Sequence, residues 1–120
     1  VKQRLHYLKM RGNEVFKVAV QSMVKAGREA LDRCGLSCDD VKMIIPHQAN
    51  TRIIEAVAKR LHIPMERVFL NIDRYGNMSA ATTAIGLDEA IRENRIHPGD
   101  IIELVAFGGG FTWGACVLRW

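Results

Sequence analysis

The sequence predicts an α/β fold, a five-stranded mixed sheet with helices on both faces. Three observations lead to this prediction. Short apolar runs alternate along the chain with segments whose apolar residues recur at helical spacing. Proline, glycine or asparagine stands at the ends of most of these segments, as is typical of element boundaries. The last two apolar runs are separated only by a glycine-rich loop, so they form an antiparallel pair, whereas the earlier runs are separated by helices and lie parallel.

The first half of the chain is predicted to form a weak strand at 5–10, a long helix, a buried strand at 41–45 and a second helix at 51–62. We expect Asn13 to cap the long helix and Gly35 to end it. Pro46 stops the buried strand, and Asn50 is expected to cap the helix that follows.

The second half of the chain is predicted to form a strand at 67–72, a turn at 74–77, a helix at 79–94, a turn at 97–100 and strands at 101–107 and 112–120. Gly76 supplies positive φ in the first turn. Small residues fill the first turns of the helix at 79–94, which lets its backbone approach its neighbours closely.

Composition excludes several classes of protein. The chain has 120 residues, of which 48% are hydrophobic and 25% charged, and this is typical of one globular domain. No apolar run is long enough to span a bilayer, so we expect no membrane partner. Three cysteines without a CxxC pair favour free thiols in a reducing cytoplasm. The chain lacks an initiator Met and begins within a pattern, so we expect it to be a piece of a longer protein.

Three features lie where strands of the predicted sheet end. His47 follows the strand at 41–45, Asn77 lies in the turn after 67–72, and three glycines follow the strand at 101–107. Each alone is ordinary, because histidine, asparagine and glycine are all common in turns. The carboxyl ends of parallel strands share one edge of a sheet, however, and all three features offer N–H donors. Converging donors predict a site for negative charge on a thioester or carbonyl oxygen.

A nucleophile is missing from this predicted site. Cys34 and Cys38 flank the end of a helix, where the helix dipole does not lower a thiol pKa. Cys116 lies inside a predicted strand. None of the three is expected to be activated, so the residues themselves predict only part of a catalytic site.

Four segments of the sequence resemble β-ketoacyl-acyl-carrier-protein synthase III, the thiolase-fold condensing enzymes that begin bacterial fatty acid synthesis. They are "MRGNEVFKVAV", "PHQANTRII", "DRYGNMSAAT" and "AFGGGFTWGACVLRW". The last three carry His47, Asn77 and the glycines in the family's order, and 77 − 47 = 30 residues separate the histidine from the asparagine, as the family pattern requires.

The resemblance implies that residues 1–120 are a C-terminal thiolase-like domain, one half of a two-half enzyme with αβαβα layers. The family's catalytic triad is Cys-His-Asn, so His47 and Asn77 are expected to be catalytic. The cysteine would come from an N-terminal half, and this chain would be inactive alone. The complete enzyme is expected to be a cytoplasmic homodimer. It uses coenzyme A thioesters and phosphopantetheine-linked substrates, with no metal or other cofactor.

The resemblance also implies an acyltransferase reaction. An acyl group, typically acetyl from coenzyme A, is transferred to the cysteine of the other half. His47 and Asn77 then donate hydrogen bonds to the thioester carbonyl of malonyl-acyl-carrier-protein while CO2 leaves, and the carbanion attacks the acyl-enzyme to give a 3-oxoacyl product. The active-site loop would be Phe107, Gly108 and Gly109, the last through its backbone N–H. Coenzyme A would contact Gly12, Asn13, Phe16 and Asn50.

Basic residues occupy one face of the predicted helix at 51–62. At about 100° per residue, the basic side chains project away from the apolar ones. This pattern is typical of a solvated helix face. The resemblance adds that the face binds acidic acyl carrier protein, through Lys17, Arg52, Ala56, Lys59 and Arg60. Nucleic acid is a weaker interpretation, because aromatic residues do not interleave with the basic ones and no run is strongly basic.

Three alternatives remain open. The chain could be a carrier-protein-binding or scaffold module without turnover. It could also belong to a polyketide-type acyltransferase, because such synthases share the histidine and the asparagine. A metal site could be built from cysteines and the four histidines, which are His6, His47, His62 and His97. No pair of them has the spacing HxxxH or CxxC, so the metal site is the weakest of the three.

Overall fold

The computed structural model describes residues 7 and 9–120, and these contain a three-stranded mixed sheet. Its strands are β1 (Val41–Pro46), β2 (Ile101–Gly108) and β3 (Thr112–Arg119), in the order β1-β2-β3. The strands β1 and β2 are parallel, and β2 and β3 are antiparallel. The predicted parallel pair and the predicted antiparallel final pair are both confirmed.

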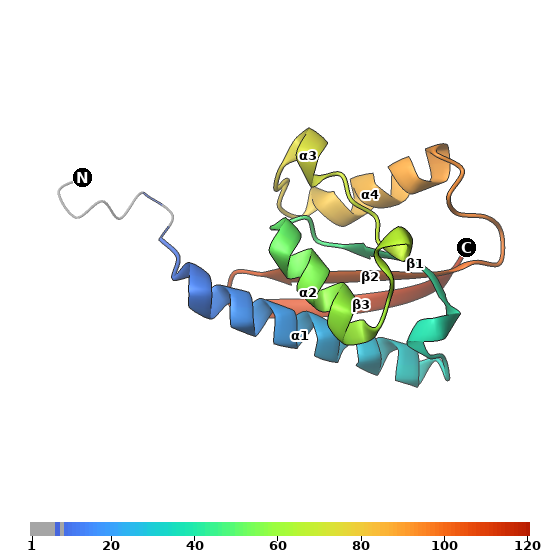
Figure 1. Ribbon diagram of the computed structural model, residues 1–120, viewed down its shortest axis with the longest axis horizontal. Coiled ribbons are helices and arrows are strands. Elements are labelled where there is room, and N and C mark those ends of the chain that lie inside the picture. The colour runs from blue at the N-terminus through green and yellow to red at the C-terminus, as the bar shows by residue number, and fades with distance from the viewer. Residues whose placement is uncertain (1–6, 8) are drawn as a thin grey trace.

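Helices cover both faces of the sheet (Figure 1). The helices α1 (Gly12–Arg33) and α2 (Thr51–Leu61) lie side by side on one face, and α4 (Ala81–Arg92) lies on the other. A short helix, α3 (Ile72–Tyr75), precedes α4, and single 3-10 turns occupy Cys38–Asp40 and Met65–Arg67. Among the described residues, no helix combines the length and the apolar character needed to cross a membrane.

Most of the predicted caps are confirmed. The Asn50 side chain accepts a hydrogen bond from the backbone N–H of Arg52 at 2.9 Å and so caps α2. Gly35 and Gly76 follow α1 and α3 with φ of +66° each. The predicted cap at Asn13 is wrong, because α1 already begins at Gly12.

The described residues form three strands, not the five that we predicted. The prediction of a strand at 67–72 is wrong: only Val68 pairs with β1, through a bridge to Ile44. Beyond Phe69 the side chain of Gln48 takes the place of a strand partner, because its amide donates to Phe69 O and its carbonyl accepts from Asn71 N–H, each at 3.1 Å.

The predicted strand at 5–10 lies mostly outside the described residues. Of the residues in that range, Tyr7, Lys9 and Met10 are described, and none of the three belongs to a strand.

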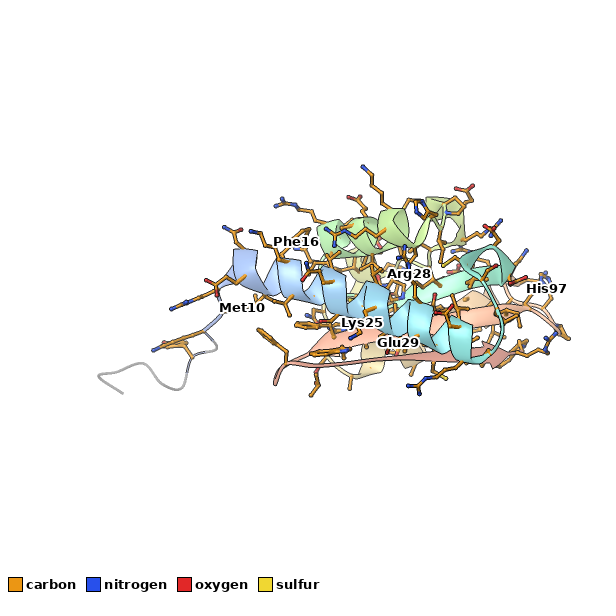
Figure 2. The ribbon with its side chains drawn as sticks, turned by 90° about the horizontal axis from the view of Figure 1, so that it is seen from below. Met10, Phe16, Lys25, Arg28, Glu29 and His97 are labelled. Atoms are coloured by element: carbon orange, nitrogen blue, oxygen red, sulfur yellow. The ribbon has the colours of Figure 1, made fainter. Side chains whose placement is uncertain are left out.

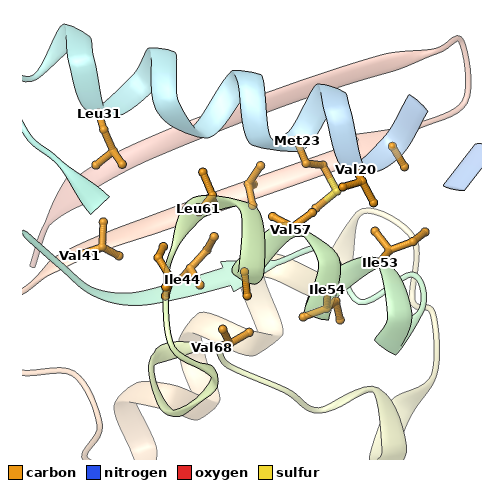
Figure 3. Packing of buried hydrophobic residues seen from close by; sticks show 14 residues of the cluster. Val20, Met23, Leu31, Val41, Ile44, Ile53, Ile54, Val57, Leu61 and Val68 are labelled. Carbon is orange, nitrogen blue, oxygen red and sulfur yellow. The ribbon is translucent and has the colours of Figure 1, made fainter. Parts of the chain in front are cut away.

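Two apolar clusters, one on each face of the sheet, hold the layers together. Figure 3 shows the larger one, in which Val20 and Met23 of α1 and Val57 of α2 pack near β1. The smaller one lies under α4 and includes Ile45, Phe69 and other buried residues, namely Met43, Ala90, Ile96 and Ile102. Alternation along β1 divides the strand between the two clusters, as a sheet covered on both faces requires.

Glycines at two positions allow the helices to approach the sheet. A Cβ atom on Gly86 of α4 would lie 2.7 Å from Ile45 Cγ2, and one on Gly27 of α1 would lie 2.6 Å from Glu103 Oε1. The expected close approach of the helix at 79–94 is therefore present. It occurs at Gly86 and not in the run of small residues at the start of that helix.

Glu103 of β2 is an ionisable side chain in the apolar layer between the sheet and α1. Its exposed fraction is 0%, and neither carboxylate oxygen has a hydrogen-bond partner. Burial raises its pKa to about 7. The folded chain therefore holds a proton on Glu103 under conditions where the unfolded chain, with a pKa of 4.5, does not.

We predict that Glu103→Gln removes a pH dependence of stability. The folded pKa is raised, so the contribution of Glu103 to stability is fully present below pH 4.5 and is lost as the pH rises to about 7. The difference of about 2.5 pKa units corresponds to about 3 kcal/mol. Urea unfolding at pH 5 and pH 8 should show the variant gaining up to that amount over the natural chain between the two pH values. Parallel stability curves for the two chains would contradict this account.

Candidate active site

His47 lies at the carboxyl end of β1, where it borders a cavity of about 410 Å³. Its backbone N–H donates to Val105 O at 2.8 Å, which continues the β1–β2 pairing by one residue. The parallel register therefore holds His47 beside the end of β2. The cavity is lined by His47, Ser79, Ala80, Thr82, Thr83, Ala106, Phe107, Gly108, Thr112, Trp113 and Gly114.

The imidazole of His47 is half-buried and has one side-chain partner. Its Nδ1 lies 2.7 Å from Oγ1 of Thr82, a residue of α4 that is fully buried. Burial lowers the pKa of His47 below its ordinary value of 6.5. The ring is therefore neutral at pH 7, so that one ring nitrogen carries a proton and the other accepts.

Asn77 lies in the loop between α3 and α4 and is exposed. Its Oδ1 accepts the backbone N–H of Ser79 at 3.0 Å. With the amide oxygen used in this local turn, the –NH2 group is the part of the side chain left to donate to another oxygen. Asn77 is not among the residues that line the cavity, but it is joined by this bond to Ser79, which is.

The glycine loop closes another side of the cavity. Phe107 and Gly108 line it, whereas Gly109 is exposed and does not. The Thr112 hydroxyl donates to Gly109 O at 3.1 Å, and this bond ties the loop to the first residue of β3. The ring centroids of Phe107 and Phe111 are 5.1 Å apart. The structure thus brings His47, Phe107 and Gly108 to one cavity and places Asn77 and Gly109 in the loops next to it.

A polar network that sequence reasoning missed anchors the segment before Asn77. Glu89 of α4 accepts hydrogen bonds from Asn71 Nδ2 at 2.8 Å, Tyr75 Oη at 2.6 Å and Arg74 Nη2 at 3.1 Å. The bond from Tyr75, followed by that from Asn71, lowers the pKa of Glu89. The sequence offers only an acidic residue on a helix as a signal, because its partners lie 14 to 18 residues away.

The four residues expected to contact coenzyme A lie at the beginnings of α1 and α2. Gly12 and Asn13 start α1 and are exposed, and Asn50 caps α2. Phe16 is half-buried, and the Arg52 guanidinium lies 5.8 Å from the centre of its ring. This cation–π contact places the two helix N-termini next to each other.

Lys59 and Arg60 of α2 border a groove that runs between α1 and α2, whereas Arg52 does not. The apolar face predicted for α2 is confirmed, because Ile53, Val57 and Leu61 are buried whereas Arg52 and Lys59 are exposed. The groove has a volume of about 850 Å³. It is lined by Gln21, Val24, Lys25, Arg28, Glu29, Ala56, Lys59, Arg60 and His62.

Arg28 joins the two helices that form this groove. Figure 2 shows Phe16 and Arg28 along the side of α1 that faces α2. Arg28 Nη2 donates to Arg60 O at 2.7 Å, near the end of α2. Lys17 is exposed on α1 and does not line the groove.

The cysteines stand away from the cavity. Burial raises the pKa of the Cys38 thiol, with Glu103 as the next cause. Cys34 and Cys116 are exposed, and none of the three cysteines lines the cavity. Within residues 7 and 9–120, no group of three or more His, Cys, Asp or Glu side chains could hold a metal ion.

Comparison with known proteins identifies the family. Residues 31–120 match 3-oxoacyl-[acyl-carrier-protein (ACP)] synthase III C terminal. The chain is 55% identical over 120 residues to β-ketoacyl-[acyl-carrier-protein] synthase III of Caldanaerobacter subterraneus subsp. tengcongensis, of which it covers 36%. The chain therefore spans about a third of the length of the curated relatives that it matches.

Solved structures agree with this match. The crystal structure of 3-oxoacyl-[acyl-carrier-protein] synthase III from Aquifex aeolicus VF5 has a TM-score of 0.94 and 51% identity, with 98% of this chain and 38% of that chain covered. The priming β-ketosynthase from the R1128 polyketide biosynthetic pathway has a TM-score of 0.87 and 36% identity, over 92% of this chain and 34% of that chain. The chain belongs to the family of C-terminal domains of β-ketoacyl-acyl-carrier-protein synthase III, with the α/β fold of half a thiolase-like condensing enzyme.

Proposed function

We propose that this chain supplies the decarboxylating half of a synthase that condenses an acyl primer with malonyl-acyl-carrier-protein. The observation that carries the proposal is the cavity at the ends of β1 and β2, where a neutral His47 meets the glycine loop. The family match supports it. Acetyl-coenzyme A is the proposed primer, and the product is a 3-oxoacyl-acyl-carrier-protein that begins fatty acid synthesis.

In the proposed reaction, N–H groups of His47 and Asn77 donate to the thioester carbonyl oxygen of the malonyl group. As the bond to the carboxylate breaks, CO2 leaves and its electron pair moves into an enolate whose oxygen these donors stabilise. The enolate carbon then attacks the acyl thioester, a carbon–carbon bond forms, and the thiolate of the enzyme is the leaving group. The Gly109 N–H is proposed to hold the oxygen of that acyl group.

The nucleophilic cysteine is proposed to come from an N-terminal half, so that this chain is inactive by itself. Two observations support this division. The chain covers only about a third of its relatives, and burial raises the pKa of the Cys38 thiol, which opposes nucleophilic activity. We propose a homodimer for the complete enzyme, and the exposed aromatic residues Trp113 and Trp120 on and beside β3 offer apolar surface for further protein contacts.

The sheet of the complete domain is proposed to extend beyond the three described strands. Within the described part of the chain β3 pairs only with β2, so its other edge is available for another strand, and residues 5–10 are the predicted candidate.

A polyketide-type synthase is the second candidate. The match to the R1128 priming β-ketosynthase favours it, but the identity of 36% is lower than the 51% found with the Aquifex synthase. A third candidate is a scaffold or carrier-binding module without turnover. Mixing the chain with the N-terminal half and measuring condensation distinguishes this module from an enzyme. Restored condensation supports the enzyme, whereas a stable complex without activity supports the module.

We predict that His47→Ala and Asn77→Ala each slow decarboxylation of malonyl-acyl-carrier-protein by on the order of 10²–10³ in the complete enzyme, because each removes one donor to the enolate oxygen. Release of ¹⁴CO2 from labelled malonyl substrate measures this rate. Acyl transfer from acetyl-coenzyme A to the enzyme should fall much less. His97→Ala, in an exposed turn, is the control and should leave both rates unchanged. Equal losses in both half-reactions would argue against the assigned roles.

The basic face of α2, with Lys17 of α1, is proposed to bind the acidic acyl carrier protein. We predict that Lys59→Glu with Arg60→Glu raises the KM for malonyl-acyl-carrier-protein at least about tenfold, because favourable charge pairs become repulsive. The KM for acetyl-coenzyme A should stay within about twofold. Lys42→Glu is the matched control, since Lys42 is an exposed lysine at the other end of β1 from His47. An unchanged KM in the double variant would remove this surface from the binding site.

A further inference from the structure

The hydroxyl group of Thr82 has one hydrogen and two neighbours that could accept it. His47 Nδ1 lies 2.7 Å from Thr82 Oγ1, and Ser79 O lies 3.2 Å from the same atom. Thr82 has an exposed fraction of 0%, so bulk water does not compete for the hydroxyl. The choice between the two acceptors decides which nitrogen of a neutral His47 carries the proton.

The two arrangements give His47 opposite chemistry. If Thr82 donates to Ser79 O, then Nδ1–H must donate to Thr82 Oγ1, and Nε2 becomes an acceptor. If Thr82 donates to Nδ1, then Nε2 carries the proton and can donate to an oxygen in the cavity. Only the second arrangement lets His47 stabilise an enolate oxygen.

We propose that Thr82 is a positioning residue that donates its hydroxyl proton to His47 Nδ1 and so holds the ring in the Nε2–H form. A separation of 2.7 Å between Nδ1 and Oγ1 suits a hydroxyl donor, because hydrogen bonds from N–H to oxygen usually measure about 2.9–3.0 Å, and the 3.2 Å distance from Oγ1 to Ser79 O is long for a bond from a hydroxyl. Ser79 O also has a second donor, the backbone N–H of Thr82 at 3.5 Å, and so does not depend on the hydroxyl. The expected effect on decarboxylation rests on the proposed function, whereas the hydrogen bond between Thr82 and His47 does not.

The position of Thr82 suits this role. It stands in the first turn of α4, and its neighbours Ser79 and Thr83 line the same cavity as His47. The helix is held close to β1 by the contact surface at Gly86 and Ile45, so the hydroxyl and the ring belong to two rigid elements. A β-branched side chain also has few χ1 rotamers, which limits where the hydroxyl can point.

The first test is ¹⁵N NMR of the whole chain labelled with ¹⁵N-histidine, with His47→Gln used to assign the His47 signals. We expect Nε2 to be protonated and Nδ1 to be an unprotonated nitrogen that accepts a hydrogen bond. In Thr82→Val, the Nδ1 signal should move downfield as that bond is lost. Thr82→Ser should keep the signal in place, and Thr83→Val, a change of the same size in the same turn, should also leave it there.

Two results would overturn the proposal: a protonated Nδ1 in the natural chain, or an Nδ1 signal that does not respond to Thr82→Val. If Thr82→Val fails to fold, the spectrum of the natural chain still decides between the two forms. In the complete enzyme, we expect Thr82→Val to lower kcat for decarboxylation about tenfold with KM unchanged. If Thr82→Val changes the protonation of His47 but not the rate, the proposed catalytic role of His47 is contradicted. The inference that Thr82 sets the position of the proton would still hold.

Discussion

The parallel pairing of β1 with β2 is the constraint on which the rest of the site depends. It continues past the strand itself, since the His47 N–H donates to Val105 O, and it brings the ends of two strands that are about 60 residues apart in sequence to the same edge. Apolar side chains on both faces of β1 pack against the helices on either side of the sheet, and these two clusters hold the paired strands in place. A ring at position 47 is therefore positioned by backbone hydrogen bonds and not by its own side chain alone.

Sequence patterns predicted the elements whose signal is local. The apolar spacing of α2, the cap at Asn50 and the positive φ of Gly76 follow from residues within one or two turns of each other, and all are present. The prediction of a strand at 67–72 is wrong because the apolar residues of this segment are buried although only Val68 pairs with β1. Gln48 supplies the hydrogen bonds that a strand partner would give, and a glutamine after a strand carries no local signal of that use.

The site divides in the same way. Motifs and strand ends predicted His47, Phe107 and Gly108, which share the cavity, because the topology of an α/β sheet already says where its loops meet. Thr82 and Glu89 escaped prediction, since their side-chain hydrogen-bond partners lie 14 or more positions away in the sequence. Glu103 escaped it as well. An acid within an apolar strand suggests an exposed position, and only the glycine facing it on α1 makes the buried one possible.

One helix orients both proposed donors. The beginning of α4 and the turn before it hold Nδ1 of His47 through Thr82 and Oδ1 of Asn77 through the Ser79 N–H, so each donor has one polar atom fixed from this segment and one left for a substrate. The later turns of the same helix fix its position: Gly86 packs on Ile45, and Glu89 binds the residues that lead into the Asn77 loop. A change that shifts α4 therefore moves both donors together. The distance between the two donors therefore changes less than the position of each donor. Two groups that donate to the same oxygen require this constant distance.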